Sequence, residues 1–318
     1  MKRGIAFVLL ALAIAPAAAQ QYPAKPVRII LPFTAGSAVD TLARIYAQHF
    51  AESWKQQVIV DNRPGANGII GMEAIAKSPA DGYTIGMGNV AVLAINPSLY
   101  PKLAYDPLRD YAPISYTAAI TNCLIVHPSL PVKSVKELVT LAKTRPGEIN
   151  YASGGVGSAQ HVPMELLKSM SGVSIVHVAY KGLTPAFNDV VAGHVPMMIS
   201  GLVTALPHHK NGRVRIIATT GTKRSSATPD IPTIGETLAG FEGDSWTGVL
   251  APAGTPLEAI SRVNADIVRV SQMPSTRERL TGLGFEVVGS TPDAFASLIR
   301  NDMARLGKVI REAGIRAE

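Results

Sequence analysis

The stretch INYASGGVGSAQHVPMELLKSMSGVSIVHV, residues 149–178, decides the fold class of this chain. It begins with a short strand-like run at 149–152 and continues through a glycine-rich loop at 153–161. Helical spacing follows over 162–170, and a second strand-like run follows at 173–178. A strand, a loop, a helix and a further strand in this order predict a βαβ unit with both strands in one sheet.

The same alternation extends in both directions along the chain. Helical stretches such as 40–53 and 256–271 separate strand-like runs, which we expect at 27–31, 58–60, 83–87, 195–199, 214–218 and 246–250. This pattern predicts an α/β fold with largely parallel sheets. In such sheets ligands bind beyond the carboxyl ends of the strands, so the loops that follow the strands are the places to search for a site.

The N-terminus has the pattern of a secretory signal peptide. Lys2 and Arg3 precede an apolar run over 5–14, and the small residues at 17–19 provide a cleavage signal. The apolar run is too short to span a bilayer, and a buried N-terminal helix is the alternative interpretation. We therefore expect residues 1–19 to be removed near Ala19 and the mature protein to reside in the periplasm.

Length and composition limit the function classes. The 318 residues exceed what one core comfortably holds, which favours two domains. The net charge of +7 is spread thinly, because charged residues make up only 17% of the chain. No basic run with interleaved aromatic residues is present, so we expect no nucleic-acid partner. The single cysteine, Cys123, lies in a strand-like run and is expected to be a buried thiol.

Two loops between a strand and a helix are candidates for an anion site. Residues 32–40 contain Gly36, with Ser37 and Asp40 as possible helix caps. Residues 153–161 are richer in glycine and end at His161. Backbone amides at the start of a helix can bind an oxyanion without lysine or arginine. An ordinary βα turn is the alternative for both loops, and His161 is either a ligand donor or a packed first-turn residue.

Further candidates follow other strands. Residues 86–91, GMGNVA, match G-x-G-x-x-A, but this pattern is weak and export removes the supply of a dinucleotide. We interpret this turn as another loop that faces a ligand, with Asn89 as a neutral hydrogen-bonding group. Tyr180, Gly182 and Ser200 also lie at strand ends, where they either line a cleft or form ordinary turns.

Recognisable catalytic motifs are absent from the sequence. We find no G-x-S-x-G, H-E-x-x-H, G-x-x-x-x-G-K-[ST] or C-x-x-C. A secreted hydrolase would need a nucleophile such as Ser158 with His161, but two residues so close at one helix start rarely have the required orientation. We therefore expect no catalytic residues, no metal site and no cofactor.

Segments along almost the whole chain, from about Tyr22 to the C-terminus, resemble the substrate-binding proteins of tripartite tricarboxylate transporters, the Bug-type receptors. The segments that carry the resemblance occur in family order and are PFTAG (32–36), VDNRPGA (60–66), SPADGYT (78–84), INPSLY (95–100), NYASG (150–154), VHVAYKG (176–182), SW (245–246) and APAGTP (251–256).

The resemblance implies a Venus-flytrap fold of the type II periplasmic-binding class, with two α/β domains joined by crossing hinge strands. The first domain would comprise residues 20–122 and 239–318, and the second residues 123–238. The ligand would be a small organic carboxylate, either a mono- or a dicarboxylate, held in the cleft by amides, hydroxyls and water. The implied substrate-binding residues are Phe33, Thr34, Ala35, Gly36, Ser37, Asp40, Gly88, Asn89, Ser153, Gly157, Ser158, His161, Tyr180, Gly182 and Ser200.

The resemblance also implies membrane permease subunits of a tripartite transporter as partners, and we expect a monomeric receptor. A sensor subunit that signals to a membrane partner is the alternative, because the binding fold would be the same. Thr34 and Ser37 replace a usual proline and glycine, Ala179 stands where proline is common, and Ser200 stands where an acidic residue is frequent. Without that acid an amino-acid ligand is disfavoured. A bulky change at Gly36 or Gly157 is expected to abolish binding and leave the fold intact.

Overall fold

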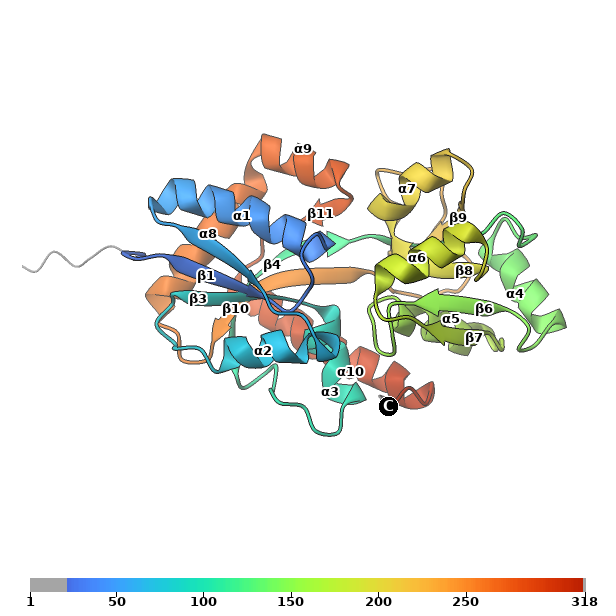
Figure 1. The fold of residues 1–318 in the computed structure, drawn as a ribbon, viewed down its shortest axis with the longest axis horizontal. Coiled ribbons are helices and arrows are strands. Elements are labelled where there is room, and N and C mark those ends of the chain that lie inside the picture. Colours follow the sequence, from blue (N-terminus) through green and yellow to red (C-terminus); the bar gives the residue numbers. More distant parts are fainter. Residues whose placement is uncertain (1–21, 317–318) are drawn as a thin grey trace, which may run out of the picture.

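The computed structural model describes residues 22–316, which form two lobes side by side (Figure 1). The predicted signal peptide, residues 1–19, lies outside the described residues. We call the lobe built on the six-stranded sheet the first lobe and the lobe built on the five-stranded sheet the second lobe. Within residues 22–316, no helix combines the length and the apolar character needed to cross a membrane.

The first lobe has the strand order β11-β4-β10-β3-β1-β2. Its parallel strands pair β1 with both β2 and β3, whereas β10 is antiparallel to β3 and β4, and β11 is antiparallel to β4. The bounds are β1 (Val27–Leu31), β2 (Val58–Asn62), β3 (Thr84–Asn89), β4 (Tyr111–Ile120), β10 (Ser245–Pro252) and β11 (Phe285–Val287).

Helices cover both faces of this sheet (Figure 1). One face packs on α1 (Ala38–Trp54) and α8 (Leu257–Gln272), and α1 buries Leu42, Ile45 and Phe50 there, as its helical spacing predicts. The short helix α9 (Pro274–Gly282) lies on the same face at the β11 edge, where it buries Leu280. The opposite face packs on the remaining elements, which are η1 (Ala66–Gly68), α2 (Ile69–Ala76), the π-helix η2 (Ala91–Ile95), α3 (Asn96–Leu99) and α10 (Pro292–Glu312).

The second lobe has the strand order β7-β6-β8-β5-β9. Strand β6 is parallel to β7 and β8, and β5 is antiparallel to β8 and β9. One face packs on α4 and α5 and the other on α6 and α7. The bounds are β5 (Asn122–Val126), α4 (Val135–Thr144), β6 (Asn150–Ser153), α5 (His161–Ser171), β7 (Val176–Ala179), α6 (Leu183–Ala192), β8 (Met197–Gly201), α7 (Leu202–Lys210), β9 (Arg215–Thr219) and η3 (Ile234–Glu236).

The predicted α/β class is confirmed, but the expectation of largely parallel sheets is wrong. Both sheets are mixed, because the strands that join the lobes enter each sheet in the reverse direction. The chain crosses from β4 to β5 through Thr121 and returns from β9 to β10 through residues 220–244. Cys123, at the start of β5, is fully buried as expected.

A half-buried carboxyl group, that of Asp244, ties the two crossings together. Asp244 Oδ1 accepts a hydrogen bond from the Thr220 hydroxyl at 2.6 Å and one from the Asn122 amide at 3.4 Å. Burial raises the pKa of Asp244 to about 6, because few charges or donors compensate for its loss of water. The next residues of β10 are fixed to α10, since Trp246 Nε1 donates to Asp302 Oδ2 at 2.6 Å.

Candidate functional site

The first candidate loop, between β1 and α1, is shaped by a buried carboxylate. Asp40 is only 3% exposed, and its Oδ2 accepts from the Gly36 amide at 2.9 Å and from Arg44 Nε at 3.0 Å. Its Oδ1 accepts from Asn62 Nδ2 at 3.0 Å, and its own amide is capped by Ser37 Oγ at 3.2 Å. Burial opposes ionisation, but the hydrogen bonds from Arg44, Gly36 and Asn62 hold the pKa of Asp40 below its usual value.

This arrangement leaves other amides of the loop available. The start of the loop is fixed through its carbonyl side, because the carbonyl of Phe33 accepts a hydrogen bond from Asn62 Nδ2 at 3.1 Å. The residues that follow, 34–36, are exposed. Within the described residues, five amides of the loop and the first turn of α1 donate to no acceptor; they belong to Phe33, Thr34, Ala35, Ala38 and Val39. These donors lie at the positive end of a 17-residue helix, where an anion is stabilised.

Sequence reasoning missed two residues that hold this loop. Arg44 lies one turn after Asp40 on α1, a spacing that by itself suggests an ion pair. Asn62 lies at the end of the neighbouring strand β2, and its role could have been sought in the VDNRPGA segment. Asp40 is therefore placed as a support of the loop, since its oxygens already have partners inside the protein.

The Gly88-Asn89 turn is also largely committed to the fold. Asn89 Oδ1 accepts from the amides of Ala91 at 3.0 Å and Val92 at 3.3 Å, and so begins the next helical turn. Gly88 is buried, and a Cβ there would lie 2.9 Å from Leu93 Cδ1. The Asn89 amide group makes no hydrogen bond to any described residue and is half-buried, so it is the polar group of this turn left for a ligand.

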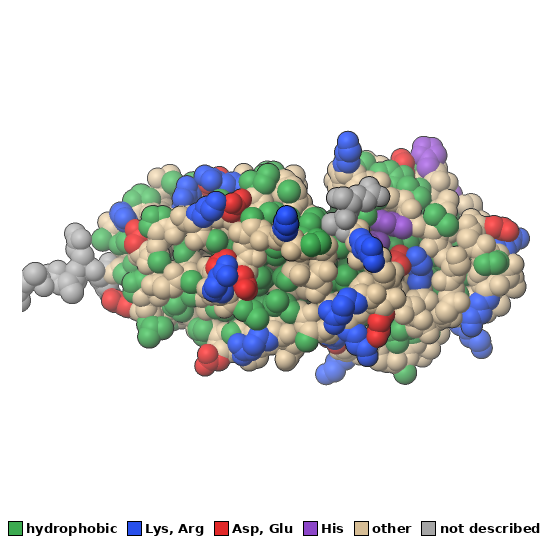
Figure 2. All heavy atoms as spheres, turned by 90° about the horizontal axis from the view of Figure 1, so that it is seen from below, with side chains coloured by type: hydrophobic (Ala, Val, Ile, Leu, Met, Phe, Trp, Pro, Cys, Tyr) green, Lys and Arg blue, Asp and Glu red, His purple; other side chains and the backbone are tan. Residues whose placement is uncertain are grey.

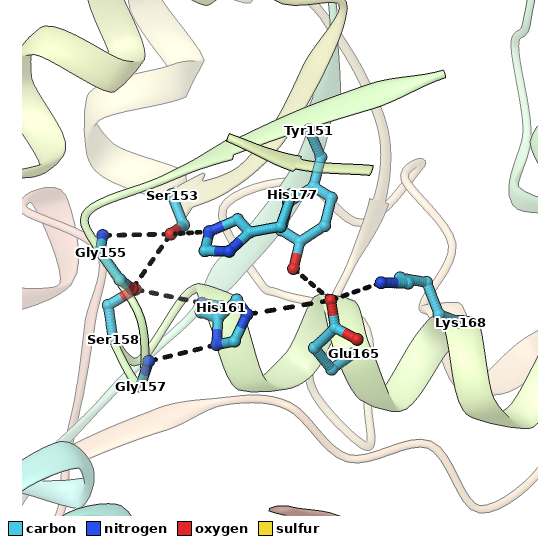
Figure 3. Close-up of polar contacts among 9 residues, drawn as sticks. All are labelled: Tyr151, Ser153, Gly155, Gly157, Ser158, His161, Glu165, Lys168 and His177. Atoms are coloured by element: carbon cyan, nitrogen blue, oxygen red, sulfur yellow. Dashed lines mark hydrogen bonds and ion pairs between the residues drawn. The ribbon is translucent and has the colours of Figure 1, made fainter. Parts of the chain in front are cut away.

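The second candidate loop, between β6 and α5, is braced by its own side chains (Figure 3). Ser153 Oγ accepts from the Gly155 amide at 3.1 Å and lies 2.6 Å from His177 Nε2. Ser158 Oγ accepts from the His161 amide at 3.2 Å, and His161 Nδ1 accepts from the Gly157 amide at 3.2 Å. Not all amides of this loop therefore point at one oxyanion, since those of Gly155 and Gly157 are bonded within it.

A buried polar network that the sequence did not reveal lies behind this loop (Figure 3). The Tyr151 hydroxyl and Lys168 Nζ both donate to Glu165 Oε1, the latter at 2.6 Å. The rings of His161 and His177 lie 4.1 Å apart, and that of Tyr151 stacks on His177 at 4.8 Å. The sequence signals for this network are two spacings on α5, four residues between His161 and Glu165 and three between Glu165 and Lys168.

The ends of β7 and β8 hold the remaining predicted residues. The Tyr180 hydroxyl donates to Asp189 Oδ2 at 2.6 Å, and this bond to a carboxylate raises the pKa of Tyr180 to about 12. Gly182 has a φ of +120° and precedes α6, and a Cβ there would meet no atom within 4 Å. Ser200 is 5% exposed, and its hydroxyl makes no hydrogen bond within the described part of the chain.

The structure brings these loops to facing ends of the two lobes (Figure 1). Helix α1 begins at the end of the first lobe that faces the second, and α6 begins at the end of the second lobe that faces the first. The lobes are also in direct contact, on the side of the first sheet that packs on α10. Three residues of the β6–α5 segment join the apolar cluster of α10 and α3 there; they are Val156, Ala159 and Val162. A Cβ at Gly157 would lie 2.0 Å from Leu99 Cδ2 of the first lobe.

Charged side chains do not dominate the surface. On the face of the molecule drawn in Figure 2, Lys and Arg side chains are scattered over both lobes and interleaved with acidic side chains. Among residues 22–316, no three His, Cys, Asp or Glu side chains are grouped in a way that could hold a metal ion. The candidate site therefore consists of backbone amides, hydroxyls and one neutral side-chain amide.

Two α/β lobes that are joined by crossing strands and present helix starts to one another define the class of two-domain periplasmic solute-binding proteins. Residues 42–315 match the model of the tripartite tricarboxylate transporter family receptor, and this chain belongs to that family. The resemblance found in the sequence is thereby confirmed, and so is the expectation of a receptor rather than an enzyme, because the family consists of solute-binding receptors.

Similar proteins support this assignment at both the sequence and the structural level. Protein BugT of Bordetella pertussis is 35% identical and covers 97% of this chain and 95% of its own length. The structure of Rpa4515 of R. palustris with adipate has a TM-score of 0.87 and 36% identity, covering 93% of this chain and all of that one. MatC of Rhodopseudomonas palustris with bound malate has a TM-score of 0.82 and 29% identity, covering 91% and 100%.

Proposed function

We propose that this protein is a periplasmic receptor that captures a small aliphatic dicarboxylate between its lobes and delivers it to the membrane permease subunits of a tripartite tricarboxylate-type transporter. The observation that carries the proposal is the set of uncommitted amides at the exposed start of α1. The adipate and malate bound to Rpa4515 and MatC support a dicarboxylate as the ligand class.

The chemistry of the loop suits a carboxylate. A carboxylate oxygen accepts strong hydrogen bonds from backbone amides, and the positive end of the α1 dipole adds to the attraction. The amides of Leu183 and Thr184 at the start of α6 also donate to no described acceptor. A ligand with a carboxylate at each end would therefore find one helix start on each lobe. Its differential affinity would favour the closed arrangement.

The residue at position 200 supports a ligand without an amino group. Ser200 is almost fully buried and uncharged, so the strand end of β8 offers no carboxylate to an ammonium group. The charged groups near the first loop do not alter this conclusion, because Asp40 is neutralised by Arg44 at 3.0 Å. We therefore expect dicarboxylates to bind more tightly than amino acids of the same length.

Exchanging Ala38 for proline tests the α1 site with little disturbance of the helix. Ala38 is the first residue of α1, where proline is well tolerated, and Ser37 already has the extended backbone (φ −69°, ψ 162°) that proline requires before it. The exchange removes one unbonded amide hydrogen. We expect calorimetric titration to show adipate binding weakened about 10-fold or more, as for loss of one hydrogen bond to a charged group.

Leu257→Pro is the matched control. Leu257 is the exposed first residue of α8, its preceding residue Pro256 is also extended, and β10 runs away from the second lobe before α8 begins. This variant should bind adipate as the wild type does. If Ala38→Pro binds adipate as tightly as the wild type does, the proposal of an anion site at α1 is wrong. If the wild type binds no carboxylate in a panel of adipate, malate, hexanoate and aspartate, the proposed ligand class is wrong.

The proposal includes export and the division into domains. We propose cleavage near Ala19 and domains of residues 20–122 with 239–318 and of residues 123–238, in agreement with the crossings at Thr121 and at 220–244. Mass spectrometry of the mature protein from the periplasmic fraction checks the cleavage. Recovery of the uncleaved chain from the cytoplasm alone would contradict it.

A further inference from the structure

The side chain of His161 is buried, and its ring nitrogens face groups of the second lobe. The Gly157 amide donates to Nδ1 at 3.2 Å, so Nδ1 is an acceptor and the ring proton of the neutral imidazole lies on Nε2. Nε2 faces Glu165 Oε1 at 3.8 Å, and the residue is only 4% exposed. His161 therefore cannot reach into the cleft while both of these contacts hold.

The surroundings of the ring keep it in this orientation and uncharged. It packs against His177 at a centroid distance of 4.1 Å, with Tyr151 farther away at 6.2 Å, and Lys168 neutralises the adjacent Glu165. Burial and the neighbouring His177 lower the pKa of His161 to about 4, with Glu165 opposing and Lys168 adding to the shift. An uncharged ring is required, because a proton on Nδ1 would point at the Gly157 amide hydrogen.

Gly157, whose amide donates to His161, also contacts the first lobe. Gly157 has a φ of +73°, and its α-carbon lies so close to Leu99 that a Cβ would be 2.0 Å from Cδ2. Val156 and Ala159, on either side, pack into the apolar cluster of the first lobe. The shape of the loop therefore decides both how the lobes seat against one another and where the amides of the loop lie.

We propose that His161 is a positioning residue for ligand binding, which fixes the second glycine loop through the Nδ1 acceptor bond to Gly157 and does not itself contact the ligand. The inference rests on the proposed function, since it uses carboxylate affinity as its readout. This role differs from that of a histidine that donates a hydrogen bond to the ligand, because such a histidine would direct a ring N–H towards the ligand.

Two substitutions of similar chemistry separate this role from general packing. In His161→Asn the side-chain oxygen takes roughly the place of Nδ1, whereas in His161→Gln it takes roughly the place of Nε2. Both variants lose the stacked ring, so the loss of packing largely cancels between them. We expect Asn to retain adipate affinity within about 3-fold and Gln to weaken it about 10-fold or more, because only Asn preserves the acceptor for Gly157.

His127 offers a matched control. Its Nδ1 accepts from the Ser129 amide, also at 3.2 Å, in an exposed turn at the start of the α4 connection. His127→Asn and His127→Gln should both bind adipate as the wild type does. Equal affinities of the two His161 variants, with wild-type binding intact, would overturn the inference, whereas absence of carboxylate binding by the wild type would overturn the proposed function instead.

A measurement on the wild-type protein keeps the inference testable even if both His161 variants fail to fold. Nitrogen-15 NMR of the imidazole groups at neutral pH distinguishes the two neutral tautomers and the cation. The expected result is a neutral His161 with its proton on Nε2. A proton on Nδ1, in either the neutral or the charged form, would refute the acceptor role.

Discussion

Replacing Gly157 with alanine should destabilise the protein more than the same replacement at Gly36, because only Gly157 faces the other lobe. The two glycines have nearly the same backbone, with φ of +73° and +78°. A side chain in this left-handed region costs about 1–2 kcal/mol at either position. At Gly36 a Cβ meets no atom within 4 Å, whereas at Gly157 it would overlap Leu99, which adds about 1–3 kcal/mol of overpacking.

The magnitudes are measured by thermal and urea unfolding, with adipate titration alongside. Each 1 kcal/mol shifts the melting temperature by about 2–4 °C for a domain of 150–250 residues, so Gly157→Ala should melt several degrees below Gly36→Ala. Leu99 is 4% exposed, and Leu99→Ala alone costs about 2–5 kcal/mol. In that background the additional cost of Gly157→Ala should fall by about 1–3 kcal/mol, because the overlap is gone.

Equal melting temperatures for Gly36→Ala and Gly157→Ala, or a double mutant of Gly157 and Leu99 whose effects simply add, would refute the contact of Gly157 with Leu99. The geometry also revises one expectation from the sequence. A bulky change at Gly36 projects into open space and is compatible with an intact fold. A bulky change at Gly157 acts on the packing between the lobes, so loss of binding in that variant would not by itself locate the ligand.

Three further predictions concern buried acids. The pKa of Asp244 is about 6 in the folded protein against about 3.9 in the unfolded chain, so its contribution to stability is full below the unfolded value and is lost as pH rises through about 6. Asp244→Asn should therefore remove a decline on the order of 1–3 kcal/mol between about pH 4 and 6 in urea unfolding. Asp40→Asn should lower the free energy of unfolding by about 1–3 kcal/mol at pH 7, because it weakens the bond with Arg44, and an unchanged urea midpoint would contradict this. Since the folded-state pKa of Asp40 is lowered, the wild-type advantage should disappear only as pH falls through that pKa, below about 4. Trp246→Phe should cost about 1–3 kcal/mol, because Asp302 loses a buried donor, and calorimetric unfolding that matches the wild type would count against it.

Much of the local structure follows from the sequence. Apolar spacing located the helix of residues 38–54 and the strand at 27–31 to within two residues, and Ser37, one of the two candidate caps, caps the helix. These features depend on neighbours a few positions away, so a single sequence contains the information. The family resemblance was available for the same reason, since its segments are short and contiguous.

Which polar groups remain for a ligand was decided only by the tertiary structure. The sequence presented Asp40, His161 and Tyr180 as candidate ligand groups, yet the fold bonds each of them to a protein partner. Asn62 reaches Asp40 from another strand, and Leu99 reaches Gly157 from another lobe. A hydrogen bond or an overlap over such separations depends on how whole elements pack, whereas spacing along the chain reports only which residues share a helix face or follow a strand.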